Sequence, residues 1–234
     1  MRLNRFIAHA GICSRREADT FISAGSVTVN GKVISEMGYQ VAPSDEVRFD
    51  GRLISSERKE YVLLNKPKNF ITTTSDEKGR RTVMELIATA SKQRLFPVGR
   101  LDRNTTGLLL FTNDGELADR LTHPKFGVRK IYHVVLNQNL KVNHLQEIEA
   151  GITLEDGLVE VDAISYIQGA TKREIGIEIH SGKNRIVRRI FEHFGYEVSK
   201  LDRVSFAGLS KKDLPRGHFR HLTEKEVSFL RMIG

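Results

Sequence analysis

The chain lacks tryptophan and has a single cysteine among its 234 residues. Cys13 can form neither an intramolecular disulfide nor a thiolate cage for a metal, so we expect a small buried hydrophobe there. No stretch approaches the ~20 consecutive apolar residues that span a bilayer. Residues 1–16 also lack the apolar run and the small-residue cleavage site of a secretory signal. These absences exclude a disulfide-stabilised scaffold and a transmembrane protein, and they predict a soluble cytoplasmic protein.

Acidic residues are the scarcer of the two charged classes. The chain has 37 Lys and Arg against 29 Asp and Glu, which gives a net charge of +8 at pH 7. A basic surplus favours polyanionic partners, nucleic acid first. Residues 1–51 hold six basic and six acidic residues, so the whole surplus belongs to the remainder of the chain. The length suits a small domain followed by a large one.

Residues 1–51 predict a small module that begins with two helices. Apolar residues with helical spacing occupy residues 3–10, and Gly11 can end that helix. Ser14 and Glu17 then form a capping box, in which both side chains satisfy free amides at the start of a new helix. Two sets of boundary signals in succession therefore predict a pair of short helices.

A hairpin is expected after the two helices. Asn30-Gly31 lies between two runs rich in β-branched residues, and a tight type I′ turn needs positive φ at both central residues. Val41 and residues 47–49 supply further strand. Residues 52–60 are polar and serine-rich, so we expect a linker there, followed by a larger domain over residues 61–234.

This order of elements resembles the αL-type RNA-binding module named after ribosomal small-subunit protein four. The resemblance is carried by Arg2-Leu3, Ser14–Ala18, Gly25–Val27 and Val29–Lys32. It implies RNA binding through the face of the two helices, with contacts from Arg2, Arg5, Arg15, Arg16 and Lys32. Five of the module's six basic residues precede Ser35, where only two acids stand. Without the resemblance, the same side chains are compatible with an ordinary solvated face.

Residues 61–234 predict a domain of the α+β class. Apolar runs predict strands over residues 61–64, 70–74, 107–112, 131–136 and 174–180. Helical spacing and caps predict helices over residues 82–90, 116–123, 184–194 and 223–233. Asp156-Gly157 between β-like runs predicts a hairpin. Because strands and helices do not alternate regularly, we expect a mainly antiparallel central sheet flanked by helices.

One loop of this domain combines a carboxylate with basic residues and glycines. Asp102 lies between Arg100 and Arg103, Gly99 and Gly107 bracket the loop, and an apolar strand follows. Catalytic groups commonly lie on loops that a rigid scaffold holds. The two arginines can keep the carboxylate ionised or meet phosphate. On these grounds alone, an ordinary surface ion pair is the better explanation.

The wider sequence resembles the RsuA branch of the pseudouridine synthases, enzymes that isomerise uridine in RNA. The matching segments are Leu64–Pro67, Gly99–Asp102, Thr106–Gly115, Lys130–Tyr132 and Gly182–Arg189. That branch also places the small RNA-binding module in front of the catalytic domain. The resemblance covers essentially the full chain. It implies an RNA pseudouridine synthase that needs no metal, ATP or organic cofactor.

The resemblance implies three catalytic residues. The family's catalytic carboxylate corresponds to Asp102, and its active-site tyrosine corresponds to Tyr132. The basic partner of the carboxylate corresponds best to Arg188, with Arg185 and Arg189 as rivals for this role. Taken by itself, Tyr132 is also compatible with a half-buried aromatic residue of a strand.

These residue types suit the chemistry of the reaction. The bond from the sugar to N1 of uracil must break, and the base must turn and rejoin through C5. Asp102 would act as nucleophile at the anomeric carbon or as base at the 2′ position, and the sequence leaves both routes open. An arginine would keep it ionised, while Tyr132 would stack on the uracil and leave it free to rotate.

The expected partner is ribosomal RNA, bound by a protein that we expect to be a monomer. Further RNA contacts are expected from basic residues near the catalytic motifs: Arg100, Arg103, Lys130, Lys183, Arg185 and Arg189. Residues 114–124 and 154–157 look most like the RluB branch of the family. That likeness implies one uridine of 23S rRNA near the peptidyl-transferase centre. Related branches that modify 16S rRNA, neighbouring large-subunit positions or tRNA are the alternatives.

Functions of two other classes fit these residues less well. A non-catalytic RNA-binding assembly factor would be expected to have lost the carboxylate, but Asp102 is present. A metal-dependent nuclease needs two or more carboxylates around a cation, whereas Asp102 is surrounded by arginines. His218 and His221 have a helix-compatible ligand spacing, but no third ligand is evident nearby, so we expect no metal site.

Overall fold

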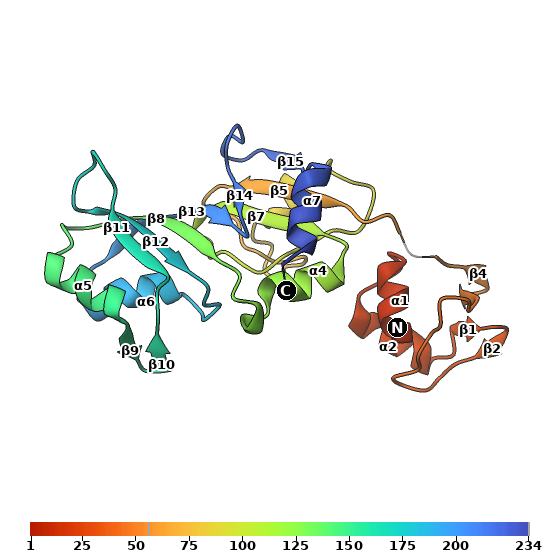
Figure 1. Ribbon diagram of the computed structural model, residues 1–234. Coiled ribbons are helices and arrows are strands. Elements are labelled where there is room, and N and C mark those ends of the chain that lie inside the picture. Colours follow the sequence, from red (N-terminus) through yellow and green to blue (C-terminus); the bar gives the residue numbers. More distant parts are fainter. Residues whose placement is uncertain (56, 234) are drawn as a thin grey trace. The chain divides into compact units, whose positions relative to one another are not determined.

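The computed structural model describes residues 1–55 and 57–233 (Figure 1). Ser56 of the expected linker and Gly234 at the end of the expected large domain lie outside the described residues. The chain folds into two compact units. The first comprises Met1–Glu60 with Lys92–Leu95 and Asn113–Gly115, and the second comprises the rest. No described helix is both long enough and apolar enough to cross a membrane.

Two short helices open the first unit, as predicted. α1 (Leu3–His9) is followed by Gly11, whose φ is 74°. α2 (Arg15–Ser23) begins with the predicted capping box. The Ser14 hydroxyl accepts from the Glu17 amide at 3.3 Å, and the Glu17 carboxylate accepts from the Ser14 amide at 2.7 Å. An N-cap of this kind contributes roughly 1 kcal/mol.

A four-stranded sheet completes the first unit. Its strands, in spatial order, are β2 (Lys32–Val33), β1 (Val27–Val29), β3 (Val47–Phe49) and β4 (Arg52–Leu53). The predicted hairpin is confirmed, because Asn30 and Gly31 have φ of 49° and 78°. The apolar sides of the helices and strands enclose a separate small core that includes Leu3, Ile7, Ile22, Val27 and Val47.

This sheet differs from expectation at two places. Val41 is buried but lies outside the strands, where its amide donates to the Met1 carbonyl at 2.7 Å. Arg52–Leu53, which we expected to begin the linker, instead form β4. The reason is a second tight turn, since Asp50 and Gly51 have φ of 46° and 76°. The module's sheet therefore extends beyond Gly51.

A mainly antiparallel sheet forms the centre of the second unit, as predicted. Its path runs β11-β12-β8-β13-β7-β5-β15, and among the described strands only β13 and β7 pair in parallel. The strands are β11 (Ala163–Tyr166), β12 (Glu174–Ile179), β8 (Lys130–Leu136), β13 (Val198–Phe206), β7 (Thr106–Thr112), β5 (Tyr61–Lys66) and β15 (Phe219–His221), with β14 (Leu209–Ser210) on β13 and β6 (Phe96–Pro97) on β7.

The parallel pairing of β7 with β13 depends on a glycine. Gly107 opposes Arg203 and has a φ of 106°. A Cβ at this position would lie 2.2 Å from the Arg203 carbonyl oxygen, which no side chain can tolerate. Gly107 thus allows the close approach that places the loop before β7 next to β13.

Helices flank this sheet (Figure 1). They are α3 (Val83–Leu86), α4 (Gly115–Thr122), α5 (Val142–Ala150), α6 (Ile186–His193) and α7 (Glu224–Arg231), with a 3-10 turn at Pro124–Phe126. α5 packs beside β11, and α6 packs beside β13. β9 (Ile152–Leu154) and β10 (Gly157–Val159) form the predicted hairpin as a separate pair. The capping box predicted for α7 is confirmed at Thr223 and Glu226.

Three predicted elements of the second unit are shorter than expected or absent. Residues 70–74 form no strand and contribute only an isolated bridge. The helix expected over residues 82–90 is confined to the four residues of α3. α6 begins at Ile186 rather than Asn184, because Arg185 takes a left-handed φ of 49° that a right-handed helix does not continue.

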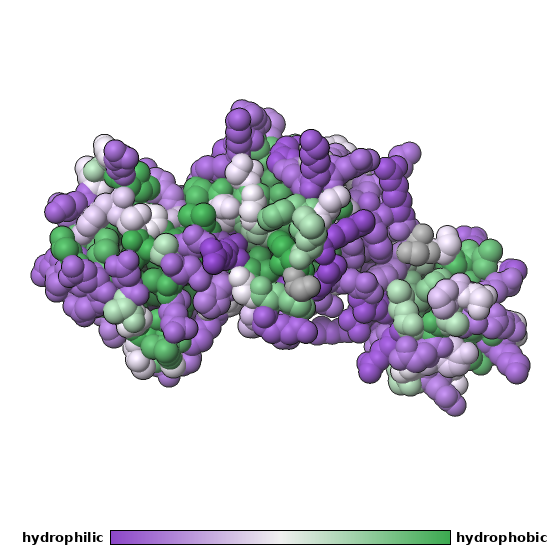
Figure 2. Space-filling model, in the orientation of Figure 1, coloured by the Kyte–Doolittle hydropathy of each residue, from purple (hydrophilic) through white to green (hydrophobic). Residues whose placement is uncertain are grey.

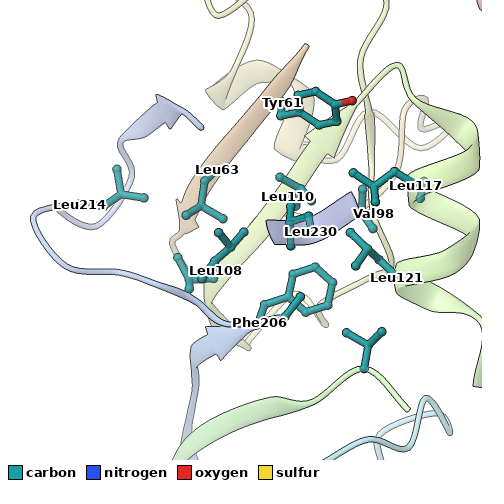
Figure 3. Packing of buried hydrophobic residues seen from close by; sticks show 14 residues of the cluster. Tyr61, Leu63, Val98, Leu108, Leu110, Leu117, Leu121, Phe206, Leu214 and Leu230 are labelled. Atoms are coloured by element: carbon teal, nitrogen blue, oxygen red, sulfur yellow. The ribbon is translucent and has the colours of Figure 1, made fainter. Parts of the chain in front are cut away.

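The core of the second unit fixes β5 and β7. Figure 3 shows Leu63 of β5 and Leu110 of β7 packed with Leu117 and Leu121 of α4 and with Leu230 of α7. Each of these side chains is at most 1% exposed. Burying one leucine of this kind contributes roughly 1.5–3 kcal/mol. β7 is therefore a rigid base for the loop that leads into it.

Candidate active site

A pocket of about 450 Å³ lies in the second unit beside the loop that leads into β7. Its walls come from residues 98–105, β8, residues 181–187 and β13. The polar and aromatic residues that line it include Arg100, Asp102, Arg103, Thr105, Lys130, Tyr132, Lys183, Arg185 and Arg203. Segments far apart in the sequence thus share one concave site with convergent polar groups, as expected of an active site.

A buried lysine holds the Asp102 loop from the inside. The Lys66 side chain is fully buried at the end of β5. Its ammonium donates to the carbonyl oxygens of Asp102 at 3.0 Å, Thr105 at 2.8 Å and Pro67 at 3.1 Å. Burial lowers the pKa of Lys66 to about 8, although the Asp102 carboxylate acts in the opposite direction. The sequence resemblance includes Lys66 but gives it no task, and in the structure it supports the backbone of the loop.

A second carboxylate fixes the point where the loop enters β7. Asp202 of β13 accepts from the Thr106 hydroxyl at 2.7 Å and from Arg216 at 2.9 Å, and it also pairs with Lys211. Burial raises the pKa of Asp202, but the hydrogen bonds from these groups outweigh it and bring the pKa to about 2. Arg216 also donates to Asn65 of β5 at 2.6 Å. Asp202 therefore joins β13, β7 and β5 behind the pocket.

The Asp102 carboxylate itself faces an arginine across the pocket. Arg185 Nη1 lies 3.8 Å from Asp102 Oδ2, which is an ion pair too long for a direct hydrogen bond. The side chains are 46% and 39% exposed, so the carboxylate is open to a ligand. Arg185 precedes α6 in the left-handed conformation, and it also lies 3.3 Å from Glu192.

Arg188, which the resemblance favours as the basic partner of Asp102, makes a different contact in this structure. Arg188 lies within α6, and its Nη1 donates to the Val198 carbonyl at 2.8 Å. Burial lowers the pKa of Arg188, as does its neighbour Arg185, whereas the Asp102 carboxylate raises it. Arg188 thus remains within the electrostatic reach of Asp102, while the ion pair is made by Arg185, one of the two rivals that the sequence suggested.

Tyr132 lies on β8 and lines the same pocket. It is 8% exposed, and across the sheet it opposes Arg203 on β13 and Ile177 on β12. The residue is therefore an aromatic side chain of a central strand that also contributes to the pocket wall. This position is compatible with both interpretations of Tyr132 from the sequence, an aromatic residue of a strand and an active-site tyrosine.

Three of the basic residues expected to bind RNA are engaged with the protein. Lys130 donates to the carbonyl oxygens of His180 at 2.9 Å and Ser181 at 3.3 Å. Arg189 makes two hydrogen bonds to the Asp156 carboxylate, at 2.6 and 3.0 Å. Lys183 donates to the Asp156 carbonyl at 2.9 Å. These contacts attach the loop before α6 to β8, and both this loop and α6 to the β9–β10 hairpin.

The other predicted RNA-binding residues lie at the surfaces of their units. Arg100 and Arg103 are exposed where the loop borders the pocket. In the first unit, Arg2, Arg15, Arg16 and Lys32 are exposed and Arg5 is half-buried. Figure 2 shows hydrophilic residues on the visible surface of each unit, interspersed with apolar ones. No contact with RNA follows from exposure alone, so these assignments stay predictions.

Sequence reasoning missed Arg203, because β13 was not predicted. Arg203 is 3% exposed and lines the pocket. The strand carries Lys200, Asp202 and Arg203 within its apolar pattern, which conceals the alternation typical of a strand. The sequence signal that could have revealed this position was the adjacent charged pair, Asp202 and Arg203, between apolar residues.

Among the described residues, no three His, Cys, Asp or Glu side chains come together in a group that could hold a metal ion. His221 lies on β15 and His218 in the turn before it, so the helical spacing expected for this pair is not realised.

Family models match both units of the chain. The family model described as RNA pseudouridylate synthase matches residues 60–193, and the S4 domain model matches residues 1–47. The ribosomal large subunit pseudouridine synthase B of Bacillus subtilis is 41% identical over 100% of this chain and 96% of its own length. The protein of the same name from Vibrio cholerae is 38% identical over 98% of this chain and 74% of its own length.

A solved structure extends the agreement to the fold. A crystal structure of pseudouridylate synthase, 28% identical in sequence, matches 98% of this chain with a TM-score of 0.70 and is itself covered to 99%. The resemblance drawn from the motifs around Asp102 and from the N-terminal helices is thereby confirmed. The chain belongs to the RNA pseudouridylate synthases, isomerase enzymes, and it carries an S4 domain in front of its catalytic domain.

Proposed function

We propose that the protein isomerises one uridine of 23S rRNA near the peptidyl-transferase centre, with Asp102 as the catalytic carboxylate. The observation that carries the chemical part is the pocket, in which the Asp102 carboxylate lies 3.8 Å from the Arg185 guanidinium and Tyr132 contributes to the wall. The relatives named for the large ribosomal subunit support the choice of rRNA.

Asp102 is held by its backbone and open at its carboxylate. Lys66 binds the Asp102 carbonyl oxygen and leaves both carboxylate oxygens available to a substrate. The Arg185 guanidinium brings a positive charge to 3.8 Å from this carboxylate. In one route the carboxylate attacks C1′ of the ribose, and in the other it removes the 2′ proton.

Tyr132 and the arginines of the α6 region prepare the substrate. The target uridine must leave its stack to enter the pocket, and a planar aromatic wall compensates for lost stacking. Tyr132 offers such a wall and still allows the detached base to turn. Arg188 adds positive charge next to Asp102 and Arg185 without forming the ion pair itself.

The RNA backbone is expected to contact the exposed basic residues around the pocket and in the S4 domain. Arg100 and Arg103 stand at the pocket border, and Arg15 and Arg16 open α2. Phosphate contacts of this kind make binding salt-dependent. The double variant Arg15→Gln/Arg16→Gln should reduce the slope of log Kd against log salt by roughly 0.7 for each phosphate that it no longer neutralises. The exposed Lys225→Gln is the matched control, and an unchanged slope in the double variant would remove the S4 helices from the proposal.

Chemical mapping of rRNA tests the proposed function as a whole. A strain without the gene is supplied with wild-type protein or with Asp102→Ala, and pseudouridine is mapped across its 16S and 23S rRNA. We expect one 23S position near the peptidyl-transferase centre to depend on wild-type protein and to stay unmodified with Asp102→Ala. Modification that persists with Asp102→Ala contradicts the catalytic assignment, and a dependent position elsewhere contradicts the target.

A further inference from the structure

Two buried polar atoms beside the pocket have no hydrogen-bond partner within the described residues. They are Oγ1 of Thr105 and Nη2 of Arg203. Both residues line the pocket, and they are 2% and 3% exposed. Buried polar groups of folded proteins are nearly always hydrogen-bonded. Two unpartnered atoms at one cavity therefore point to a ligand that supplies the missing partners.

Arg203 is the more unusual of the two because it is charged. Its Nε donates to the Leu108 carbonyl at 2.8 Å, and its guanidinium carbon lies 4.7 Å from the centre of the Phe206 ring. Within the part of the chain that the structure describes, no carboxylate pairs with it at 4.0 Å or less. A buried cation without a counter-ion is strongly disfavoured in a protein interior. The site is thus short of one negative charge.

Arg203 brings its positive charge to the side of the pocket where the uracil base is expected. Across the β13–β8 pair, Arg203 opposes Tyr132, the residue proposed to stack on the uracil. Its charge also acts on Lys130, another pocket residue, whose pKa is lowered first by burial and then by Arg203. The charge of Arg203 therefore influences another pocket residue, so its role is not limited to packing in the core.

Isomerisation of uridine creates negative charge on the base for part of the reaction. When the C1′–N1 bond breaks, its electron pair stays on the uracil and spreads over N1, O2 and O4. C1′ meanwhile bonds to Asp102, or Asp102 has taken the 2′ proton. The turned base then bonds to C1′ through C5 as the bond or the proton returns from Asp102. C5 finally loses its proton and N1 gains one, so the atoms of uridine are conserved and no redox partner is needed.

We propose that Arg203 is a catalytic residue whose Nη2 donates to a carbonyl oxygen of the uracil as the C1′–N1 bond breaks. The inference rests on the proposed function, because it needs a uridine in this pocket. Leu108 and Phe206 hold the guanidinium in place before the substrate arrives. Donors that are fixed where charge develops contribute strongly to catalysis, and removing one slows a reaction by roughly 100- to 1,000-fold.

Changing the leaving group can distinguish the proposed catalytic role of Arg203 from a purely structural one. Fluorine at C5 lowers the basicity of the detached uracil anion. 5-Fluorouracil is therefore a better leaving group than uracil. If Arg203 stabilises the departing uracil, a variant without it should depend more strongly on the leaving group. A variant that has only loosened the packing between β7 and β13 should be slowed equally on uridine and on 5-fluorouridine.

The experiment uses purified full-length protein and full-length 16S and 23S transcripts made with uridine or with 5-fluorouridine. Single-turnover loss of the parent nucleoside is measured after digestion to nucleosides, and RNA affinity is measured separately. The variants are Arg203→Met, Arg203→Lys and the control Arg220→Met, whose parent arginine is ion-paired with Glu226 at 2.6 Å in the same unit. Arg203→Lys keeps the charge and serves if Arg203→Met does not fold.

We expect Arg203→Met to slow the reaction of uridine by roughly 100-fold or more, with RNA affinity within about threefold of wild type. The slowing should be at least several-fold smaller on 5-fluorouridine, and Arg203→Lys should be affected in the same sense but less. Equal slowing on both substrates, or a loss confined to RNA affinity, overturns the proposal. Conversion of 16S alone by wild type contradicts the 23S target and leaves this comparison intact, whereas no conversion by wild type contradicts the proposed function itself.

Discussion

The two walls of the pocket are held in different ways. The wall that carries Asp102 rests on buried groups, with the Lys66 ammonium fully buried and the Asp202 side chain 13% exposed. The wall formed by α6 and the loop before it relies more on surface ion pairs, in which the Asp156 and Arg185 side chains are 44% and 46% exposed. Buried polar contacts are strong when satisfied, whereas exposed ion pairs contribute little and are screened by salt.

The difference separates a fixed part of the site from an adjustable part. The Asp102 carboxylate must approach one ribose carbon or one 2′ proton in a defined geometry, which a rigidly held loop favours. The arginines opposite must admit an RNA strand and then close on its charges. Exposed ion pairs allow such movement because they are readily exchanged for phosphate contacts. Changes on the first wall should therefore damage stability and rate together, while changes on the second should act mildly and depend on salt.

The largest effect is expected from Lys66→Met on the fixed wall. The change leaves the carbonyl oxygens of Asp102 and Thr105 buried without their donor. We expect the free energy of unfolding to fall by about 3–5 kcal/mol, together with loss of pseudouridine formation. Urea denaturation measures the first effect. The exposed neighbour Lys68→Met is the control, and equal stability of the two variants would show that Lys66 does not support the loop.

Asp202→Asn should have the next largest effect, with a pH signature. The folded pKa of Asp202 is about 2, below the ~3.9 of an unfolded chain, so its carboxylate stabilises the fold above pH ~4. That stabilisation is lost as the pH falls from about 4 towards 2. At pH 7 the variant should lose roughly 1.5–3 kcal/mol of the free energy of unfolding, and the gap to wild type should narrow in acid. Asp213→Asn in the neighbouring exposed turn is the control, and a gap independent of pH would contradict the assignment.

Arg185→Met should reduce the rate only moderately. Its ion pair with Asp102 is half-exposed and 3.8 Å long, so it is worth at most about 1 kcal/mol, or roughly fivefold in rate. The loss should shrink at high salt, because salt already screens the pair in wild type. Single-turnover rates at two salt concentrations measure this. Arg188→Met, which breaks a partly buried hydrogen bond to Val198, should instead give a loss that salt does not change.

The smallest effect on stability is expected from Asp156→Asn. The change removes the carboxylate charge that pairs with Arg189 at 2.6 Å and with Lys183 at 3.6 Å, while Lys183 keeps its hydrogen bond to the backbone carbonyl of residue 156. Thermal unfolding should shift little, but the loss of one negative charge beside two cations should strengthen RNA binding at low salt and steepen its salt dependence. Measured affinities over a salt series test this. A weaker affinity in the variant would mean that the hairpin, rather than the two cations, makes the RNA contact.

The sequence predicted the parts of the fold that local chemistry determines. The capping boxes at Ser14 and Thr223 and the turn at Asn30-Gly31 all carry their own signals, and all are present. Asp102 and Tyr132 were also placed in one pocket, as their motifs suggested. These features need only short stretches of sequence to specify them.

Features that depend on tertiary contacts could not be predicted from the sequence. β13 is a central strand, but Asp202 and Arg203 interrupt its apolar pattern because each serves a partner on another strand. The position of Arg185 at 3.8 Å from Asp102 depends on its left-handed conformation before α6, which helical spacing does not reveal. Charged residues within an apolar segment therefore marked functional positions and hid the strand at the same time.

The central claim is that the Asp102 carboxylate reacts with the ribose, and the isosteric variant Asp102→Asn tests it most directly. Purified wild type and Asp102→Asn are compared for pseudouridine formation in 23S rRNA under single-turnover conditions, with RNA affinity measured in parallel. We expect no detectable pseudouridine with Asp102→Asn and an affinity within about threefold of wild type. Pseudouridine formation by Asp102→Asn at a rate within roughly tenfold of wild type would contradict the claim.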